Sequence, residues 1–297
     1  MMAKRAGITS LVLATSYLAD VFTPYFGDGS HWGMELQYAV EEEPLGTGGA
    51  IRNAAQLLNR SESIVIFNGD ILSSHDLSKQ ISMHESLDAD VTMYLTHVAD
   101  AKAYGCVPID EQGRVIAFLE KMENPIANTI NAGCYVFNPR VIGEIPAGKV
   151  VSIEREVFPE LVERGRAIFG IVDDSYWIDI GTPAALLKGS ADLVRGIANA
   201  GALDGVPVEH RSTEYVALKG AIVEPGAKIT GGSAIGRGTR VESNAVIDGS
   251  IICDGAIVMA GAQLRKCFVA AGTTVSSELN VGDSYISQGE ITSILPL

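Results

Sequence analysis

Apolar residues in the first two thirds of the chain alternate between short runs and helical spacing. The four-residue runs 11–14 and 64–67 predict buried strands, and residues 36–40 are apolar at alternate positions, as in a half-buried strand. Residues 51–58 carry apolar side chains at helical spacing, directly after a glycine-rich segment. Such an alternation, up to about residue 200, predicts βα units around a mostly parallel sheet.

The last third of the chain changes to a period of six. An apolar residue recurs at every sixth position, clearly five times and then more weakly twice: Val223, Ile229, Ile235, Val241, Ile247, Cys253 and Met259. This period is too short for a helix and matches the hexapeptide repeat of a parallel β-helix, in which one apolar residue per face fills the interior. The pattern breaks after Met259 and resumes at Val269, which predicts a short insertion and a last partial coil.

These two patterns predict two domains, as the length of 297 residues also suggests. We expect an α/β domain over 1–198, a linker rich in small residues over 199–212, and the β-helix over 213–297. Thr182 and Pro183 predict the start of a helix that leads out of the first domain, because they suit the N-cap and the first helical position.

The composition indicates a soluble, cytoplasmic protein. Apolar residues make up 47% of the chain, but no apolar run is long enough for a membrane helix and the first ten residues lack the apolar stretch of a signal peptide. The net charge of −14 opposes binding to nucleic acid or to an anionic membrane. The four cysteines are far apart, which favours buried reduced thiols over a metal site or a disulfide framework.

Four short segments carry candidate chemistry: 41–49, 67–70, 118–121 and 177–182. Asp70 follows a predicted buried strand, at the edge where open α/β sheets place their ligand sites. Two aspartates, Asp70 and Asp179, would suit Mg²⁺, which takes one or two carboxylates and completes its shell with water and phosphates. Each segment also has an ordinary interpretation, as a turn or, for Glu120 and Lys121 after a predicted strand at 115–119, as a solvated charge pair.

Taken together, the four segments resemble the sugar-1-phosphate nucleotidyltransferases, most closely the mannose-1-phosphate guanylyltransferase branch. The resemblance implies a Rossmann-like nucleotidyltransferase domain of the α/β class, incomplete at its N-terminus, followed by a left-handed parallel β-helix of hexapeptide repeats. It implies a reaction of GTP with mannose 1-phosphate that gives GDP-mannose and pyrophosphate, with Mg²⁺ as the cofactor. A pyrimidine nucleotide (UTP or dTTP) with glucose 1-phosphate is the alternative within the same reaction class.

The resemblance also assigns site residues. Asp70 and Asp179 would bind the metal and, with Lys121, form the catalytic set. The nucleotide would contact Glu41, Gly46, Thr47, Gly48, Asn68 and Gly69, with Glu42 and Glu43 as alternatives to Glu41. The sugar phosphate would contact Tyr104, Gly105, Glu120, Lys121 and Asn131. A carboxylate suits guanine because the N1–H and the 2-amino group are adjacent donors that it can accept together.

The sequence departs from the family pattern at its beginning. The family's Gly-x-Gly-Thr-Arg loop and its Pro-Lys-Pro segment do not occur among the 297 residues. We expect that a strand, loop and helix, on the order of 30 residues or more judged from the size of a βαβ unit, are missing, and that the chain as written turns over poorly. A start placed too late, a shortened chain, or a non-catalytic subunit that binds nucleotide-sugars would each explain this.

The histidines bear on the tail. None of the five histidines has metal-ligand spacing, and none lies after Arg211. Hexapeptide acyltransferases, in contrast, share a histidine in the coil that acts as general base. We therefore expect the β-helix to mediate homo-oligomerisation rather than acyl transfer.

Overall fold

The computed structural model describes residues 2–15, 19–59, 61–120 and 122–295. Contacts divide the chain into two compact units: unit 1 comprises Met1–Gly69 and His75–Ser175, and unit 2 comprises Asp70–Ser74 and Tyr176–Leu297. Each unit is described separately below. The domain boundaries 1–198, 199–212 and 213–297 stay predictions.

Unit 1 is built on a mixed sheet. Its strands are β3 (Ile64–Phe67), β5 (Val91–His97), β6 (Gly105–Cys106), β7 (Leu119–Glu120), β8 (Thr129–Phe137) and β9 (Ile168–Val172). They lie in the order β7-β6-β8-β5-β9, with β3 also paired to β8. Strand β8 runs antiparallel to β3, β5 and β6, while β5 and β9 are parallel. The prediction of a mostly parallel sheet is therefore wrong, because β8 returns in the opposite direction between β3 and β5.

A second, parallel sheet in unit 1 joins β1 (Ser10–Thr15) to β2 (Glu35–Val40). The strands predicted at 11–14, 36–40 and 64–67 are thus confirmed. The strand predicted at 115–119 is wrong. Val115 forms an isolated bridge with Ile109, and regular pairing starts at Leu119.

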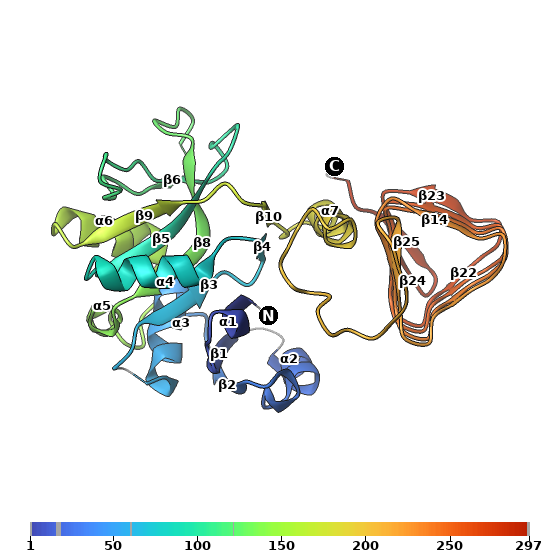
Figure 1. The fold of residues 1–297 in the computed structure, drawn as a ribbon, viewed down its shortest axis with the longest axis horizontal. Helices are drawn as coiled ribbons and strands as arrows, with labels where there is room; N and C mark the ends of the chain where they lie inside the picture. The colour runs from blue at the N-terminus through green and yellow to red at the C-terminus, as the bar shows by residue number, and fades with distance from the viewer. Residues whose placement is uncertain (1, 16–18, 60, 121, 296–297) are drawn as a thin grey trace. The chain divides into compact units, whose positions relative to one another are not determined.

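Helices surround these sheets (Figure 1). They are α1 (Met2–Arg5), α2 (Ala19–Phe26), η1 (Ser30–Trp32), α3 (Gly46–Ala54), η2 (Ala55–Leu57), α4 (Leu77–Ser86), α5 (Pro139–Glu144), η3 (Ile153–Val157) and α6 (Phe158–Glu163). Tyr135, Phe137 and Phe158 are completely buried, and their rings lie against one another in the core of the unit. Helix α3 starts within the glycine-rich segment, so that Gly46, Gly48 and Gly49 form its first turn.

Unit 2 begins with a two-stranded ribbon and a helix. Strands β4 (Ile71–Ser73) and β10 (Trp177–Asp179) pair antiparallel, and α7 (Pro183–Val194) follows. The predicted helix start is confirmed: the Thr182 side chain accepts a hydrogen bond from the backbone N–H of Ala185 at 3.2 Å, and Pro183 is the first helical residue.

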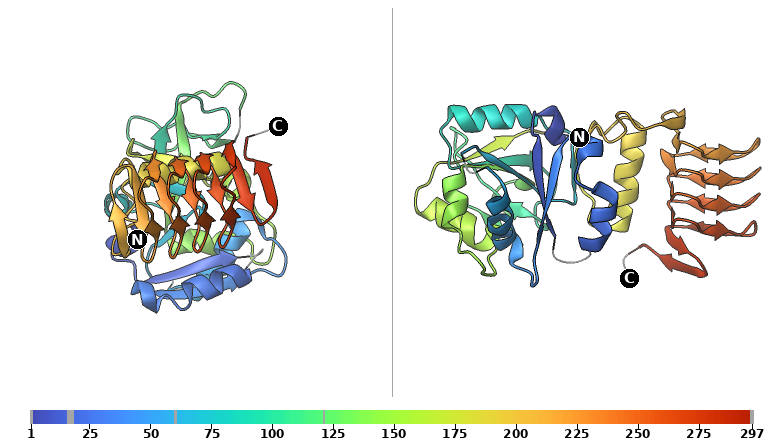
Figure 2. Two further views of the ribbon diagram at one scale, coloured as in Figure 1. Left: turned by 90° about the vertical axis from the view of Figure 1, so that its right-hand side faces the viewer. Right: turned by 90° about the horizontal axis from the view of Figure 1, so that it is seen from below.

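The rest of unit 2 is a parallel β-helix with three faces (Figures 1 and 2). The first face comprises β11 (Val208–Arg211), β12 (Tyr215–Leu218), β15 (Ser233–Ile235), β18 (Ile251–Ile252), β21 (Phe268–Val269), β24 (Ser284–Ser287) and β25 (Glu290–Ser293). The second comprises β13 (Ile222–Val223), β16 (Arg240–Val241), β19 (Ile257–Val258) and β22 (Thr274–Val275), and the third β14 (Lys228–Thr230), β17 (Val246–Asp248), β20 (Gln263–Arg265) and β23 (Asn280–Gly282).

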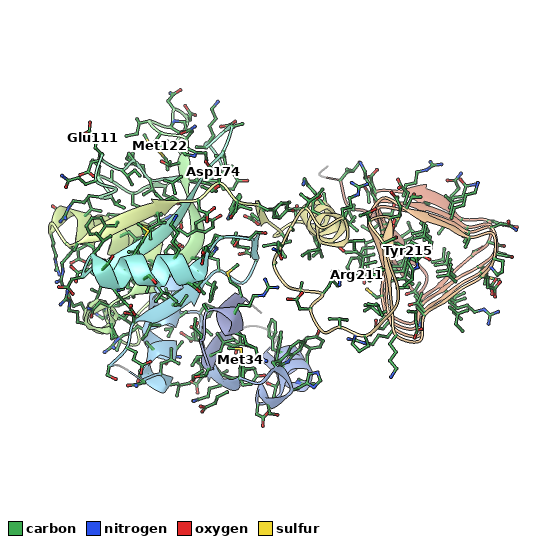
Figure 3. All side chains as sticks on the ribbon, viewed as in Figure 1. Met34, Glu111, Met122, Asp174, Arg211 and Tyr215 are labelled. Carbon is green, nitrogen blue, oxygen red and sulfur yellow. The ribbon has the colours of Figure 1, made fainter. Side chains whose placement is uncertain are left out.

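Apolar side chains at six-residue intervals fill the coil, as predicted, up to Ile247. Ile235, Val241 and Ile247 are completely buried, and Tyr215, labelled in Figure 3, packs against this core. Beyond Ile247 the prediction fails: Met259 is 38% exposed and Val258 is buried in its place.

A change in coil length explains this shift. Ala217 pairs with Ile235, eighteen residues further on, whereas Ile235 pairs with Ile252, seventeen further on. Later coils keep the shorter repeat, with Ile252 paired to Val269. Each coil after the first is thus one residue shorter than the first, so the predicted insertion is wrong and the column moves from Cys253 to its neighbour Ile252.

Candidate active site

The structure brings the two predicted metal ligands together. Asp179 is the last residue of β10, and its register partner Ile71 follows Asp70. The backbone N–H of Ile180 donates to the carbonyl oxygen of Asp70 at 2.8 Å, which fixes the two chain segments side by side. Asp70 is exposed and Asp179 is half-buried, so both carboxylates are accessible from solvent.

Gly181 provides the space in which these carboxylates meet. A Cβ built on Gly181 would lie 2.9 Å from Oδ1 of Asp179 and 3.6 Å from Oδ2 of Asp70. The backbone N–H of Gly181 also donates to Oδ1 of Asp179 at 2.8 Å, which orients that carboxylate. The two side chains therefore converge over a position that any other residue would fill.

This arrangement fits a magnesium ion. Mg²⁺ is usually held by one or two carboxylates, with water and substrate phosphates as its other ligands. Among the described residues, no group of three or more His, Cys, Asp or Glu side chains that could hold a metal occurs.

Glu41 stands apart from the two glutamates that follow it. The residue Glu41 is 9% exposed, whereas Glu42 and Glu43 are exposed. Oε2 of Glu41 accepts a hydrogen bond from the backbone N–H of Leu45 at 3.0 Å, and Oε1 is buried with no hydrogen-bond partner in the described part of the chain. A buried acceptor that is left free costs stability unless a ligand supplies a donor.

The glycines after Glu41 have a structural reason that the sequence did not reveal. Gly46 has φ +68°, and a Cβ there would lie 2.7 Å from the carbonyl oxygen of Val151. The N–H of Gly48 donates to the same oxygen at 2.8 Å, and a Cβ on Gly48 would lie 3.1 Å from it. These residues are small because the first turn of α3 packs against the backbone at Val151.

Thr47 lies between these glycines and is also held internally. Its hydroxyl donates to Oε2 of Glu154 at 2.8 Å and accepts from the N–H of Ile153 at 2.9 Å. Glu154 is 107 residues away in the sequence, and no signal in the sequence could have linked it to Thr47.

A cavity of about 630 Å³ in unit 1 brings three of the predicted nucleotide residues to one place: Thr47, Asn68 and Gly69. Asn68 is fixed at the end of β3 because its N–H donates to the carbonyl oxygen of Gly133 at 2.8 Å. Gly69 is exposed and has open space where a Cβ would lie.

The predicted sugar residues lie on neighbouring strands of the mixed sheet. Gly105 pairs with Glu120, and a Cβ on Gly105 would lie 3.0 Å from Oε2 of Glu120. Asn131 follows Ile130, which pairs with Cys106. Tyr104 directly precedes β6 and is half-buried. Lys121 lies outside the described residues.

The Asn131 side chain is engaged at both ends, donating to the Tyr135 hydroxyl at 2.6 Å and accepting from the N–H of Gly133 at 3.1 Å. These two hydrogen bonds hold the Asn131 side chain within β8.

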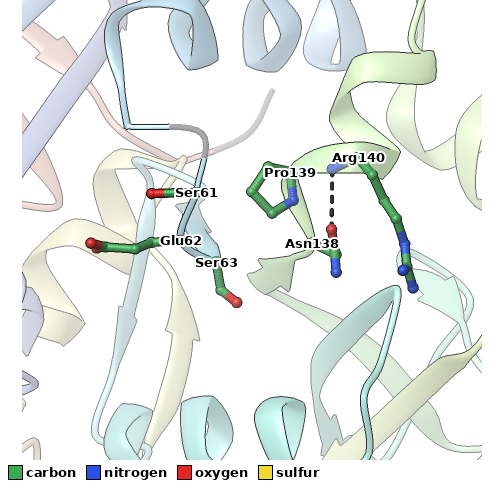
Figure 4. A pocket seen from close by; sticks show the side chains of 6 residues that line it. All are labelled: Ser61, Glu62, Ser63, Asn138, Pro139 and Arg140. Atoms are coloured by element: carbon green, nitrogen blue, oxygen red, sulfur yellow. Dashed lines mark hydrogen bonds between the residues drawn. The ribbon is translucent and has the colours of Figure 1, made fainter.

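A further pocket of about 420 Å³ contains none of the predicted site residues (Figure 4). It is lined by Ser61, Glu62, Ser63, Asn138, Pro139 and Arg140. The hydrogen bond drawn as a dashed line in Figure 4, which the backbone N–H of Arg140 donates to Oδ1 of Asn138 at 3.1 Å, caps α5. Arg140 also pairs with the buried Asp90, so its charge stabilises the fold.

Comparison with known proteins gives the family. The family model described as nucleotidyl transferase matches residues 1–196. The chain belongs to the nucleotidyl transferase family. A second model, described as a GlmU-like C-terminal hexapeptide, matches residues 208–290. The resemblance noted from the four segments is thus confirmed, as is the fold class of a nucleotidyltransferase domain followed by a left-handed β-helix of hexapeptide repeats.

Several relatives are similar over most of this chain. A mannose-1-phosphate guanylyltransferase of Mycobacterium tuberculosis is 53% identical over 75% of this chain and 60% of its own. A D-glycero-alpha-D-manno-heptose 1-phosphate guanylyltransferase of Aneurinibacillus thermoaerophilus is 36% identical over 64% of this chain and 80% of its own. The chain thus spans 60% of the length of the mycobacterial relative and 61% of that of a Neurospora crassa mannose-1-phosphate guanyltransferase.

Solved structures agree with the family. HddC from Yersinia pseudotuberculosis matches with a TM-score of 0.54 and 29% identity over 63% of this chain and 80% of its own, and a second crystal structure of HddC contains GMP-PN. Within the part of the chain that the structure describes, no helix is long and apolar enough to cross a membrane.

Proposed function

We propose that this protein transfers the guanylyl group of GTP to mannose 1-phosphate and releases pyrophosphate. The observation that carries the proposal is the convergence of Asp70 and Asp179 over Gly181 in a chain of the nucleotidyl transferase family. The choice of substrates is supported by the 53% identity to a mannose-1-phosphate guanylyltransferase.

The reaction needs no protein nucleophile. A phosphate monoester is mostly ionised at neutral pH because its second pKa is about 6, so an oxygen of mannose 1-phosphate can attack the α-phosphorus directly. The new oxygen–phosphorus bond forms as the bond to pyrophosphate breaks. Asp70 and Asp179 would hold Mg²⁺, which neutralises charge on the phosphates when bound. The remaining task of the protein is to position two anions in line.

Glu41 is proposed to read the base. Its buried Oε1 lacks a partner within the described residues, and guanine offers the adjacent N1–H and 2-amino donors that a carboxylate can accept. Uracil and thymine present acceptors toward such a carboxylate, which would repel them. Glu120 is proposed to contact sugar hydroxyls, and Lys121 the acceptor phosphate, as the family resemblance implies.

Ligand binding tests the base assignment without requiring turnover. A ligand present at 100 times its Kd stabilises a protein by about 2.7 kcal/mol, which raises the Tm of a domain of this size by roughly 5–10 °C. We expect a rise of that order with GDP-mannose and little rise with UDP-glucose. Equal shifts with the two ligands would argue against guanine specificity.

Glu41→Gln sharpens the test. The amide oxygen can still accept from the N–H of Leu45, while the amide NH₂ now faces the guanine donors. The GDP-mannose shift should largely disappear, and Glu42→Gln, an exposed neighbour, should retain it. If both variants bind like the unmodified chain, Glu41 does not contact the base.

Release of pyrophosphate separates an enzyme from a non-catalytic binding subunit. The proposed enzyme releases pyrophosphate from GTP only when mannose 1-phosphate is present. Because the chain as written is expected to turn over poorly, the informative outcome is a positive one: even slow release that depends on mannose 1-phosphate would refute the non-catalytic alternative.

We also propose that the β-helix mediates self-association. One outer column of its first face carries Ile251, Phe268 and Tyr285 in register, with the two aromatic rings stacked at 5.9 Å and Tyr285 39% exposed. Light scattering tests this proposal, and a monomeric chain would refute it. A cytoplasmic location is proposed as well, supported by the four free cysteines and by the nucleotide substrate.

A further inference from the structure

The Thr47 hydroxyl is held in one orientation by a glutamate far away in the sequence. It donates its proton to Oε2 of Glu154 at 2.8 Å and accepts a hydrogen bond from the backbone N–H of Ile153 at 2.9 Å. The hydroxyl of Ser152 donates to the same Oε2 at 3.2 Å, so this oxygen is fixed from two sides. A hydroxyl has one proton and two lone pairs, and these contacts use the proton and one lone pair. A further group that binds the Thr47 oxygen must therefore be a donor.

The backbone donors at the start of α3 are also in use. The N–H of Leu45, at the N-cap, donates to Oε2 of Glu41 at 3.0 Å. The N–H groups of Gly48 and Gly49 donate to the carbonyl oxygen of Val151 at 2.8 and 3.4 Å. The start of a helix usually attracts anions through such N–H groups when they are free. Because the protein binds these donors itself and places two carboxylates beside them, this turn suits a ligand group that donates hydrogen bonds rather than a phosphate.

Guanine has one donor hydrogen more than a single carboxylate accepts. Its N1–H and the two hydrogens of its 2-amino group lie at one edge of the base. The carboxylate of Glu41, which is proposed to read the base, can accept the N1–H and one amino hydrogen, so the second amino hydrogen needs another acceptor. Thr47 is exposed and lies two residues after Leu45, which binds Glu41. Its oxygen thus belongs to the same turn of α3 that Glu41 contacts.

We propose that Glu154 is a positioning residue for base recognition. It keeps the Thr47 proton turned away from the nucleotide, so that the Thr47 oxygen accepts the second hydrogen of the guanine 2-amino group. This inference rests on the guanylyl transfer proposed above. Glu154 acts through the hydroxyl and does not itself touch the nucleotide. Helix η3, which carries Glu154, is a π-helix, and π turns occur frequently at functional sites.

A purely structural role of Glu154 makes a different prediction. The contact between Glu154 and Thr47 joins η3 to α3, which lie about 100 residues apart in the sequence, and it stabilises the fold whatever the ligand. Loss of a structural contact lowers the free energy of unfolding and weakens all nucleotides alike. Loss of a positioning contact changes the preference between a base that carries the 2-amino group and a base that lacks it.

Binding of two nucleotides to the full chain separates these roles. The probes are GDP and inosine 5′-diphosphate (IDP), whose base differs from guanine by the lack of the 2-amino group. Their Kd values are measured by isothermal titration calorimetry. Thr47→Val removes the accepting oxygen and keeps the branched shape, so the ratio of the IDP Kd to the GDP Kd should fall about fivefold, which corresponds to about 1 kcal/mol. Thr47→Ser keeps the hydroxyl and should retain the ratio.

Glu154→Leu tests the positioning itself. Without the carboxylate, the Thr47 proton faces an apolar side chain, so it turns toward the nucleotide, and GDP must displace it before the oxygen can accept. The Kd ratio should again fall about fivefold. Glu154→Gln keeps an oxygen that accepts from Thr47 and should retain the ratio. In a Thr47→Val background, Glu154→Leu should not change the ratio further, because the hydroxyl through which it acts is absent.

Glu156→Leu is the matched control in the same helix. Glu156 accepts a hydrogen bond from the backbone N–H of Ser152 at 2.8 Å, so its loss disturbs η3 without freeing the Thr47 hydroxyl, and the ratio should stay unchanged. An equal fall of the ratio in Glu156→Leu, or no fall in Glu154→Leu, would overturn the proposal. Circular dichroism checks the fold. If Glu154→Leu unfolds, Thr47→Val decides, since an unchanged ratio there removes the hydroxyl on which the proposal depends.

The comparison of GDP-mannose with UDP-glucose judges the proposed base choice separately. If Glu41→Gln removes the guanine preference while Thr47→Val and Glu154→Leu keep the ratio of the IDP Kd to the GDP Kd, the proposed function stands and the positioning role of Glu154 is refuted. Equal binding of GDP and IDP by the unmodified chain also refutes that role, because the 2-amino group is then not recognised. Equal stabilisation by GDP-mannose and UDP-glucose refutes both proposals.

Discussion

Replacing Gly181 by alanine adds one methyl group beside the carboxylates of Asp70 and Asp179, and so tests whether they bind a cation together. The backbone at Gly181 is outside the left-handed region, so alanine can adopt its conformation. The new Cβ would lie 2.9 Å from Oδ1 of Asp179, closer than real Cβ contacts come, and 3.6 Å from Oδ2 of Asp70. The Asp179 carboxylate must therefore move by roughly half an ångström, which also strains its 2.8 Å hydrogen bond from the N–H of Gly181.

The expected cost falls on metal binding rather than on folding. Loss of a group that orients a metal ligand typically lowers affinity by about 10–100-fold. We expect at least a tenfold loss for Gly181→Ala, which corresponds to about 1.4 kcal/mol. The effect on Tm should be small, because Asp179 is half-buried and can rotate toward solvent.

Manganese provides the assay, since carboxylate and water sites accept Mn²⁺ as well as Mg²⁺. Free Mn²⁺ is titrated against the protein by electron paramagnetic resonance. Gly143→Ala is the matched control, because nothing lies within 4 Å of a Cβ there. Equal Mn²⁺ affinity for Gly181→Ala, Gly143→Ala and the unmodified chain would refute the proposal that Asp70 and Asp179 share a cation.

Three further outcomes are expected. Asp70→Asn should abolish Mn²⁺ binding at any concentration that saturates the unmodified chain, since the amide keeps the shape but not the charge; retained binding would remove Asp70 as a ligand. Ile235→Asp should unfold the coil, because Ile235 is completely buried and an unpaired charge there costs several kcal/mol; loss of β-structure by circular dichroism checks this, and an unchanged spectrum would contradict it. Burial lowers the pKa of His75 and His84 from the usual value of 6.5. As the pH falls below about 6.5, the unfolded chain therefore binds protons that the native state does not bind, and the free energy of unfolding should decrease. Urea unfolding between pH 7.5 and 5.5 measures this: His84→Gln should weaken the dependence and His31→Gln, an exposed histidine, should not.

The sequence predicts local patterns well and long-range pairings poorly. The hexapeptide core up to Ile247 could be predicted because each interior position is set by its neighbours in sequence. The missing residue per coil after Ile247 could not, because nothing in the apolar pattern separates Ile252 from Cys253 as the inward residue. The mixed sheet was also out of reach, since the direction of β8 depends on strands far from it in the chain.

The candidate site shows the same difference between local signals, which the sequence carries, and long-range contacts, which it does not. The Asp-x-Gly spacing of Asp179 and Gly181 is a local signal, and the structure places both residues where the two carboxylates meet. The resemblance implies that Gly46 and Gly48 contact the nucleotide, and the structure shows in addition that both lie against the backbone at Val151. A glycine in a sequence shows that something approaches closely, and only the fold shows what approaches.

Helix α7 packs against the segments that carry Asp70 and Asp179 and also against the first coil of the β-helix. On one side, a Cβ on Gly189 would lie 3.1 Å from Ile180 and 3.3 Å from Leu72, residues of the segments that carry Asp179 and Asp70. On the other, a Cβ on Gly232 would lie 2.7 Å from the carbonyl oxygen of Ala191, so the helix rests directly on the first coil. Packed interiors transmit displacements rather than absorbing them. A substitution in the first coil should therefore change the affinity of the proposed site at Asp70 and Asp179 for a cation.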